Sequence, residues 1–237
     1  MTSKIKDGFL FCVLYFVGLI LGLVFQIFRF LGFIEIQNWE RFPHKTGNLI
    51  LVSNHPSLYE PILLPLLFFK EYALRPVRFA PYSTPDESNY YKRWYWSWIR
   101  PRAIPIDRGN QRKEIRALLQ MKELLNKGKV IVLFPEAGRT FKGEEFFYSK
   151  KGKRIRILKE GVGLLIQKTN PTILPVWVEG TNKVIPNSKK RLYCFPRFWR
   201  SSVIKIGHPI KINGETPRER IAQKLATILL ELADEEE

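Results

Sequence analysis

A run of twenty apolar residues near the N-terminus, Phe9 to Phe28, most constrains what this chain can fold into. The run contains no charged residue, and Gln26 is its one amide. At about 1.5 Å per residue, a helix of this length can just cross a bilayer core of about 30 Å. A helix that is apolar on every face is unusual in a soluble domain. We therefore expect residues 1–33 to form a membrane-anchoring segment and residues 34–237 to form the folded domain.

The sequence leaves the path of this apolar run open. Gly18 and Gly22 form a small-xxx-small pair that would let another helix approach closely. The same glycines could instead break the run into two short helices that enter the membrane and return. A buried core helix is the third interpretation. The run lacks a small-residue cleavage site before a polar mature start, which argues against a removed signal peptide.

The net charge of +17 over 237 residues implies an anionic partner, which could be nucleic acid, a membrane surface or a phosphorylated small molecule. The sequence has no zinc-finger spacing, aromatic RNA-binding signature or basic helix-turn-helix pattern, so nucleic acid is not expected. An apolar anchor directs the positive charge towards anionic lipid. His44, His55 and His208 are scattered, and no metal site is expected.

The two cysteines, Cys12 and Cys194, are far apart and stand among apolar or aromatic residues. We expect two unpaired thiols, which are typical of a reducing compartment. We accordingly expect the folded domain on the cytoplasmic face of a membrane.

From Gly47 onward, short apolar runs alternate with amphipathic ones. The pattern predicts strands at 48–54, 129–136, 172–180 and 202–207, with a weak strand at 76–81, and helices at 62–72, 87–100, 110–128, 159–170 and 216–237. Residues 102–107 are predicted to form a short extended segment. Alternating strands and helices predict an α/β fold, a single domain with a mixed, mostly parallel central sheet flanked by helices.

Some finer features can also be predicted. The helix at 110–128 should end at Gly128 and bury an apolar stripe made of Ile115, Leu118, Leu119, Leu124 and Leu125. The last helix should begin with Thr216 as its N-cap and Pro217 at its first position. The basic, irregular segment 142–159 is the best candidate for a mobile loop.

The stretch "NHPSLYE" places His55 five residues before Glu60, and a proline follows each of them. The residue before a proline is pushed out of the α region. A turn through Pro56 and Ser57, with Pro61 opening the next helix, can bring the two side chains together at the end of a buried strand. A carboxylate on one ring nitrogen fixes the histidine tautomer and leaves the other nitrogen free to accept a proton.

Two interpretations of this stretch remain open. Ser57 and Glu60 also match the S-x-x-E capping box, in which Glu60 serves only the backbone and His55 is a core residue. If the pair is catalytic, the sequence offers no G-x-S-x-G nucleophile. The attacking hydroxyl could then belong to the substrate, and the reaction would be a transfer.

Three further stretches favour the catalytic interpretation. "AIPIDR" ends at Arg108, "FPEAGRT" spans Phe134 to Thr140, and "ILPVWVEG" surrounds Pro175. With "NHPSLYE", these four motifs stand in the order in which they occur in the glycerolipid acyltransferase family, and over roughly residues 48–210 the chain resembles the 1-acylglycerol-3-phosphate acyltransferases of that family. Two positions depart from the family pattern. Glu60 replaces an aspartate, and Ala137 and Gly138 replace Gly and Thr, so a hydroxyl that could contact the acceptor is missing.

The resemblance implies that residues 34–237 form an acyltransferase domain in which His55 is the general base and Glu60 orients it. The residues that it places at the substrate are Asn54, Arg108, Glu136, Gly138, Arg139 and Pro175. Arg108 and Arg139 would hold the phosphate of the acceptor, because guanidinium groups suit phosphate oxygens. Glu136 would place the glycerol or the loop.

The implied partners are a lysophospholipid acceptor, most simply lysophosphatidic acid, and an acyl donor that is either acyl-CoA or acyl carrier protein. The aromatic and basic segments 90–102 and 189–200 suit an anionic membrane surface, although they could also be core aromatics beside surface charge. Another acceptor, such as an N-acyl amino acid lipid or a lipid A precursor, and a non-enzymatic membrane or nucleic-acid-binding protein are the alternatives.

Overall fold

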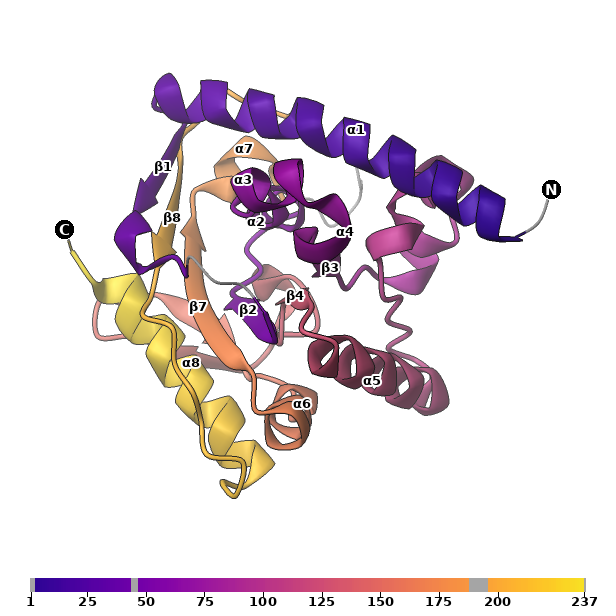
Figure 1. Ribbon diagram of the computed structural model, residues 1–237. Coiled ribbons are helices and arrows are strands. Elements are labelled where there is room, and N and C mark those ends of the chain that lie inside the picture. Colours follow the sequence, from indigo (N-terminus) through magenta and orange to yellow (C-terminus); the bar gives the residue numbers. More distant parts are fainter. Residues whose placement is uncertain (1–2, 44–46, 188–195, 237) are drawn as a thin grey trace.

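The computed structural model describes residues 3–43, 47–187 and 196–236 (Figure 1). A six-stranded sheet runs through the molecule in the order β1-β8-β7-β2-β4-β3. Its strands are β1 (Ile34–Gln37), β2 (Leu49–Ser53), β3 (Tyr82–Ser83), β4 (Val130–Leu133), β7 (Thr172–Glu179) and β8 (Ser202–Ile206). All neighbouring strands are parallel except β7 and β8, which are antiparallel. The mixed, mostly parallel sheet confirms the fold predicted from the sequence.

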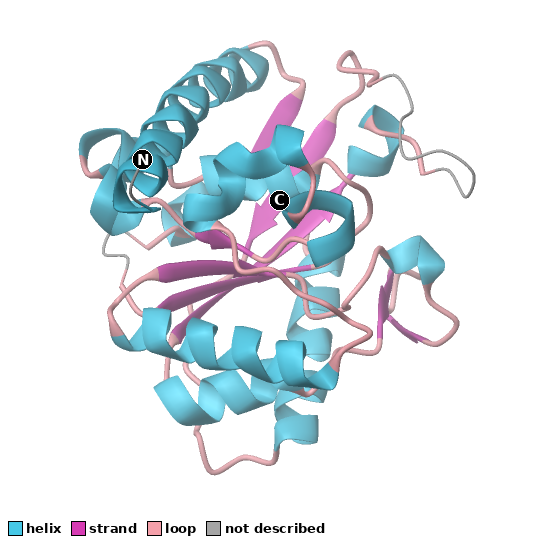
Figure 2. Cartoon of the chain, turned by 90° about the vertical axis from the view of Figure 1, so that its right-hand side faces the viewer, coloured by secondary structure: helices cyan, strands magenta, loops and turns pink. Residues whose placement is uncertain are grey.

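Helices cover both faces of the sheet (Figure 2). One face packs against α5 (Gln111–Asn126), α6 (Gly161–Thr169) and α8 (Arg218–Asp234), and the other against α1 (Ser3–Phe30), α2 (Glu60–Leu66) and α3 (Phe69–Leu74). Short helices complete the fold: α4 (Pro76–Phe79), α7 (Thr181–Val184), a π-helix at Glu87–Tyr91 and 3-10 helices at Trp39–Arg41, Trp94–Arg102 and Thr140–Lys142.

Strand β2 explains why this sheet needs two covering layers. All five of its residues are buried. Ile50 and Val52 point into the core beneath α5, α6 and α8, whereas Leu49 and Leu51 point into the core beneath α1 and α2. A parallel strand that is apolar on both faces is stable only when helices exclude water from both. The end of β2, where His55 follows, is therefore fixed from both sides.

Helix α1 is one continuous helix that lies across the domain (Figure 1), so Gly18 and Gly22 do not break it. Instead, the rings of Tyr72 and Phe69 from α3 pack against these two glycines. The Tyr15 hydroxyl donates to the carbonyl of Ala73 at 2.7 Å, and the Tyr72 hydroxyl donates to the carbonyl of Gly18 at 2.9 Å. The glycine pair therefore provides the close approach expected of it.

The outer face of α1 is exposed and apolar. Residues Ile5–Phe30 are long and apolar enough to cross a membrane by length and composition, and 11% of the most apolar window is buried. This low burial is not that of a core helix. The exposed apolar side chains along it include Phe9, Phe16, Ile20, Leu23, Ile27 and Phe30.

The structure corrects two predictions about irregular segments. Pro76–Phe79 is a short helix and not a weak strand, because Pro76 at the first helical position presets a helical φ. Segment 142–159 is not an open loop, since it contains an antiparallel hairpin of β5 (Phe146–Tyr148) and β6 (Arg154–Arg156). The turn of this hairpin is fastened to the end of α8, where Ser149 Oγ donates to Asp234 Oδ1 at 2.7 Å.

The structure also corrects two predictions about helices. In α5 the buried residues are Ala117, Met121 and Leu125, whereas Ile115 and Leu119 are exposed. Of the predicted stripe, Leu125 is buried and Leu118 and Leu124 pack partly buried against the core, but the prediction missed Ala117 and Met121. Helix α8 has Pro217 at its N-cap, so Thr216 lies one position too early to cap it. Gly128 does adopt the left-handed conformation, φ +69°, as expected of a residue that ends a helix.

Candidate active site

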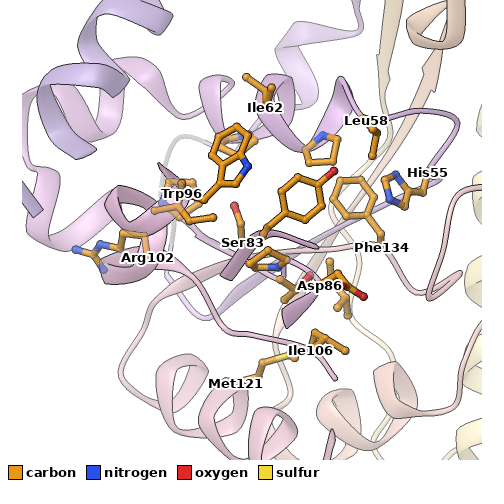
Figure 3. Close-up of a pocket in the computed structure, with 18 of the residues that line it drawn as sticks. His55, Leu58, Ile62, Ser83, Asp86, Trp96, Arg102, Ile106, Met121 and Phe134 are labelled. Carbon is orange, nitrogen blue, oxygen red and sulfur yellow. The ribbon is translucent and has the colours of Figure 1, made fainter. Parts of the chain in front are cut away.

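His55 and Glu60 meet at the carboxyl end of β2. The chain turns between them, and His55 Nδ1 lies 2.6 Å from Glu60 Oε1. Glu60 is the first residue of α2 and is fully buried, while the His55 side chain retains 12% exposure. The ring of His55 stacks on Phe134 with 4.7 Å between centroids, and both line the cavity (Figure 3).

Glu60 bonds both to the backbone of the turn and to His55, so the interpretation in which it serves only the backbone is wrong. Glu60 Oε1 also accepts a hydrogen bond from the Ser57 backbone N–H at 2.8 Å, and Ser57 Oγ donates to Glu60 Oε2 at 2.8 Å. One carboxylate therefore satisfies the turn and holds the imidazole. Because it is fixed from three directions, its oxygen can act as a rigid support for the His55 ring.

The electrostatics of the pair favour an ionised carboxylate. Burial alone would raise the pKa of Glu60, but the hydrogen bond and charge interaction with His55, with help from Ser57, hold this pKa below its ordinary value of 4.5. An ionised Glu60 only accepts hydrogen bonds. We therefore assign the proton to Nδ1 of His55, which leaves Nε2 as the free basic nitrogen.

The lowered pKa of Glu60 predicts an acid-dependent loss of stability. A carboxyl group whose pKa is lower when folded stabilises the protein above its unfolded pKa, and this contribution disappears as the pH falls through the folded pKa. We expect wild-type protein to lose more unfolding free energy than Glu60→Gln on going from pH 6 to below 4.5. Chemical denaturation at several pH values in this range measures the free energy of unfolding of both proteins. If this free energy falls equally with pH in the two proteins, the prediction is contradicted.

A cavity of about 1250 Å³ extends from His55. Apolar side chains line much of it, among them Phe11, Leu14, Ile62, Trp96 and Met121. They come from α1, α2, α5 and the 3-10 helix Trp94–Arg102. Cationic side chains also line it, among them Arg108, Arg139, Lys142, Arg156 and Lys159, and so do the carboxylates Asp86, Glu114 and Glu160. The cavity can therefore accept a molecule with a long apolar chain and an anionic group, and the His55 imidazole lies in the same cavity.

Three of the six residues expected at the substrate line this cavity, namely Arg108, Gly138 and Arg139. Burial lowers the pKa of Arg108, although its charge is retained because an arginine pKa starts far above neutrality. Arg139 donates from Nη1 to Asn187 Oδ1 at 3.3 Å, and Asn187 donates in turn to the Pro56 carbonyl at 2.8 Å. Arg139 is thereby tied to the turn that follows His55.

The other three residues expected at the substrate do not line the cavity. Asn54 is buried, and its amide donates to the Val178 carbonyl at 2.9 Å and accepts from the Val178 N–H at 2.8 Å. Its side chain thus joins the ends of β2 and β7 and is not free for a ligand. Pro175 lies inside β7, beside Val52 of β2, and is part of the sheet.

Glu136 is also buried behind the wall, where it joins separate loops. Its Oε1 accepts from the His55 N–H at 2.6 Å and from Thr140 Oγ1 at 2.8 Å, and its Oε2 accepts from the Arg156 N–H at 3.0 Å. Burial raises its pKa. Of the two expected roles, placing glycerol or placing the loop, this geometry fits the second.

Arg156, Lys159, Ser57 and Thr140 belong to the site but were not predicted for it. Arg156 and Lys159 lie in the basic segment that the sequence marked only as a mobile loop. Its positive charge was the available signal, and the hairpin that directs these side chains to the cavity could not be read from composition. Among the residues that the structure describes, no three His, Cys, Asp or Glu side chains gather to hold a metal ion.

The third motif contains a strained residue. Ala137 has φ +53°, which is in the left-handed region. This conformation costs a residue with a Cβ atom about 1–2 kcal/mol because the Cβ approaches the following carbonyl oxygen. We expect Ala137→Gly to raise the unfolding free energy by about 1 kcal/mol and the melting temperature by about 2–4 °C. Differential scanning calorimetry measures this change. A lower melting temperature would show that the Ala137 methyl group makes contacts that outweigh the strain.

Comparison with curated proteins identifies distant relatives. The chain is 26% identical over 159 residues to 1-acyl-sn-glycerol-3-phosphate acyltransferase LPAT1, chloroplastic, of Arabidopsis thaliana, covering 66% of this chain and 39% of that protein. It is 25% identical over 158 residues to 1-acyl-sn-glycerol-3-phosphate acyltransferase BAT2, chloroplastic, of Brassica napus, covering 66% and 40%. The chain therefore spans about two fifths of the length of the curated relatives it matches.

The fold has a counterpart among solved structures. The crystal structure of the 1-acyl-sn-glycerophosphate (LPA) acyltransferase PlsC from Thermotoga maritima superposes with a TM-score of 0.63 at 20% identity, covering 100% of this chain and 86% of that one. At this identity the similarity concerns the fold. Residues 33–179, which hold the four motifs up to β7, match the sequence profile of the Acyltransferase family. This match covers more than half of the chain, and the protein belongs to the acyltransferase family.

Proposed function

We propose that this protein transfers a fatty acyl group from a thioester donor, acyl-CoA or acyl carrier protein, to the free hydroxyl of a lysophospholipid, with lysophosphatidic acid as the preferred acceptor. The observation that carries the proposal is the contact of 2.6 Å between His55 Nδ1 and the buried Glu60, in a cavity with apolar and cationic parts. A lysophosphatidic acid combines the two features that this cavity would accommodate, a long hydrocarbon chain and a phosphate.

The proposed mechanism starts with a proton transfer. Nε2 of His55 removes the proton of the acceptor hydroxyl while that oxygen attacks the thioester carbonyl carbon. The tetrahedral intermediate then breaks its carbon–sulfur bond, and the leaving thiolate takes the proton from Nε2. Glu60 keeps the ring oriented and stabilises the imidazolium that exists between these steps. General-base catalysis of this kind contributes about 10²–10⁴-fold to the rate.

We further propose that the protein works on a membrane, with α1 as its contact. The outer face of α1 exposes apolar side chains such as Phe16, Ile20 and Phe30, while Phe11 and Leu14 of the same helix line the cavity. A lysolipid could then pass from the bilayer to the cavity without crossing water. The expected location of the domain on the cytoplasmic face remains part of this proposal.

Part of the aromatic and basic segment 189–200, which was expected at the membrane surface, lies outside the described residues. This part is 189–195, and it includes Cys194.

An acceptor panel tests the proposed function. Purified protein in detergent receives lysophosphatidic acid, lysophosphatidylglycerol, lysophosphatidylcholine or monoacylglycerol, each with palmitoyl-CoA or palmitoyl acyl carrier protein, and products are identified by mass spectrometry. We expect a new ester on lysophosphatidic acid above all. An ester on a different lysolipid would correct the acceptor, and no ester on any acceptor with either donor would refute the proposal.

A further inference from the structure

Arg156 lies against two glycines of the third motif and the turn that follows it. A Cβ atom at Gly138 would stand 2.5 Å from Arg156 Nη1, and a Cβ atom at Gly143 would stand 2.6 Å from Arg156 Cγ. Neither distance is tolerated between real atoms, so any side chain at Gly138 or Gly143 would displace the arginine. The Arg156 side chain therefore occupies the space that side chains at these two positions would need.

Arg156 and Arg108 converge above Gly138. Arg108 Nη1 lies 3.6 Å from the same Cβ position, and both side chains line the cavity. The charge of Arg156 also contributes, after burial, to the lowered pKa of Arg108, while Asp86 and Glu114 act in the opposite direction. Within the described residues, no carboxylate forms an ion pair with Arg156. Two neighbouring guanidinium groups repel each other, and an anion bound between them would offset this repulsion.

We propose that Arg156 is a further ligand of the acceptor's phosphate beside Arg108, and that Gly138 is a glycine because the Arg156 guanidinium occupies the space above it. This inference rests on the proposed function for the identity of the acceptor. It also answers a question raised by the sequence, since Gly138 stands where the family pattern has a threonine hydroxyl. The guanidinium fork supplies donors in place of that hydroxyl, and it suits the several oxygens of a phosphomonoester.

The buried carboxylate of Glu136 places this arginine relative to the base. Glu136 accepts the backbone N–H of His55 through one oxygen and the backbone N–H of Arg156 through the other, at 2.6 and 3.0 Å. The position of Arg156 is therefore fixed to the same group that fixes His55. A phosphate bound by Arg156 and Arg108 would therefore lie next to backbone that is tied to the His55 backbone through Glu136.

Acceptor selectivity tests the role of Arg156. Kinetics are measured for wild type, Arg156→Met and Arg156→Lys with lysophosphatidic acid and with monoacylglycerol, which lacks phosphate. We expect Arg156→Met to lower kcat/KM for lysophosphatidic acid roughly 10- to 100-fold, mainly through KM, and to leave monoacylglycerol unchanged. Arg156→Lys should recover part of the loss, because it restores the charge without the fork. Equal losses on both acceptors, or no loss, would overturn the inference.

A matched control lies on the same strand. Arg154 is exposed, does not line the cavity and places its guanidinium 4.5 Å from the Phe146 ring. Arg154→Met removes the same charge from the same hairpin, and we expect wild-type kinetics with both acceptors. If Arg154→Met and Arg156→Met lower the lysophosphatidic acid rate equally, the effect belongs to the net charge of the hairpin and the inference fails.

The glycine provides an independent test. Gly138→Ala should displace the Arg156 guanidinium and lower kcat/KM for lysophosphatidic acid by a similar factor. Once Arg156→Met is present, adding Gly138→Ala should cost little more, because the two changes remove the same contact. Strictly additive losses in this double-mutant cycle would show that the two positions act independently. They would contradict the inference that Gly138 makes room for the Arg156 guanidinium.

Binding without an acyl donor separates this inference from the proposed function. Lysophosphatidic acid in detergent micelles is titrated into wild type and Arg156→Met by calorimetry, with monoacylglycerol as reference. We expect a Kd for lysophosphatidic acid roughly 10- to 100-fold weaker in the variant. If wild type esterifies no acceptor but shows this difference, the proposed function fails and the phosphate site stands. If both proteins bind lysophosphatidic acid equally, the phosphate site fails.

Discussion

Replacing His55 with alanine is expected to lower the rate of acyl transfer roughly 10²- to 10⁴-fold, because this change removes the proposed general base. The protein should stay folded. The contacts that position this segment come from the backbone of His55, whose N–H donates to Glu136 at 2.6 Å and whose carbonyl accepts from the Thr140 N–H at 2.8 Å. Steady-state rates and circular dichroism measure the two expectations separately.

Two further variants sharpen this prediction. Glu60→Gln keeps the size of the side chain but no longer fixes the His55 tautomer, so we expect a large loss of kcat with little change in KM. His208→Ala removes an exposed histidine that does not line the cavity, and this control should keep the wild-type rate. If His55→Ala retains full activity while folded, the proposed mechanism is wrong.

Gly22→Val is expected to lower both stability and activity, because the contact between α1 and α3 leaves no space for a side chain. A Cβ atom at Gly22 would overlap the ring of Phe69. Phe69 is itself packed edge-on against Tyr72 at 5.7 Å, so its ring cannot turn away without disturbing the second contact. Overpacking of this kind costs about 1–3 kcal/mol.

The expected loss of activity follows from the position of α1 in the cavity wall. Phe11, Leu14 and Leu21 of this helix line the cavity. Displacing the helix opens the apolar part to water, and we expect kcat/KM to fall roughly tenfold or more. This corresponds to the loss of about 1.4 kcal/mol of apolar contact with the acyl chain.

Two glycine positions on the same helix serve as controls for Gly22→Val. A Cβ atom at Gly8 would meet nothing within 4 Å, and one at Gly18 would meet Tyr72 at an ordinary 3.5 Å. Gly8→Ala and Gly18→Ala should therefore leave activity near wild type. Thermal unfolding in detergent and transfer rates compare the three variants. A Gly22→Val protein with wild-type stability and activity would show that α1 can leave the domain without consequence.

The central part of the fold could be predicted because its signals are local. β2, β4 and β7 are continuous apolar runs, and such runs are typical of strands buried on both faces. β1 and β3 were missed. They are short, and β1 is a strand only because it pairs with β8, more than 160 residues away in the sequence. Pairing over this distance leaves no mark in the sequence of β1 itself.

In the candidate site too, local contacts could be predicted and contacts between distant segments could not. The meeting of His55 and Glu60 could be predicted, since two prolines and a five-residue separation restrict the turn between them. The place of Arg156 could not be predicted, because it depends on the space above Gly138 and on a hairpin within a segment of irregular composition. Motif membership also does not reveal that the Asn54 amide bonds to both the carbonyl and the N–H of Val178.

The shared support at Glu136 has a consequence for which alcohol of the acceptor reacts. Since one buried carboxylate holds the backbones of both His55 and Arg156, the proposed anion site and the proposed base share a common support. A headgroup anchored at one end then offers a single carbon of the glycerol skeleton to the imidazole. The distance between the bound phosphate and the imidazole would thus select the hydroxyl that reacts. Regioselectivity would not require a pocket shaped to each hydroxyl.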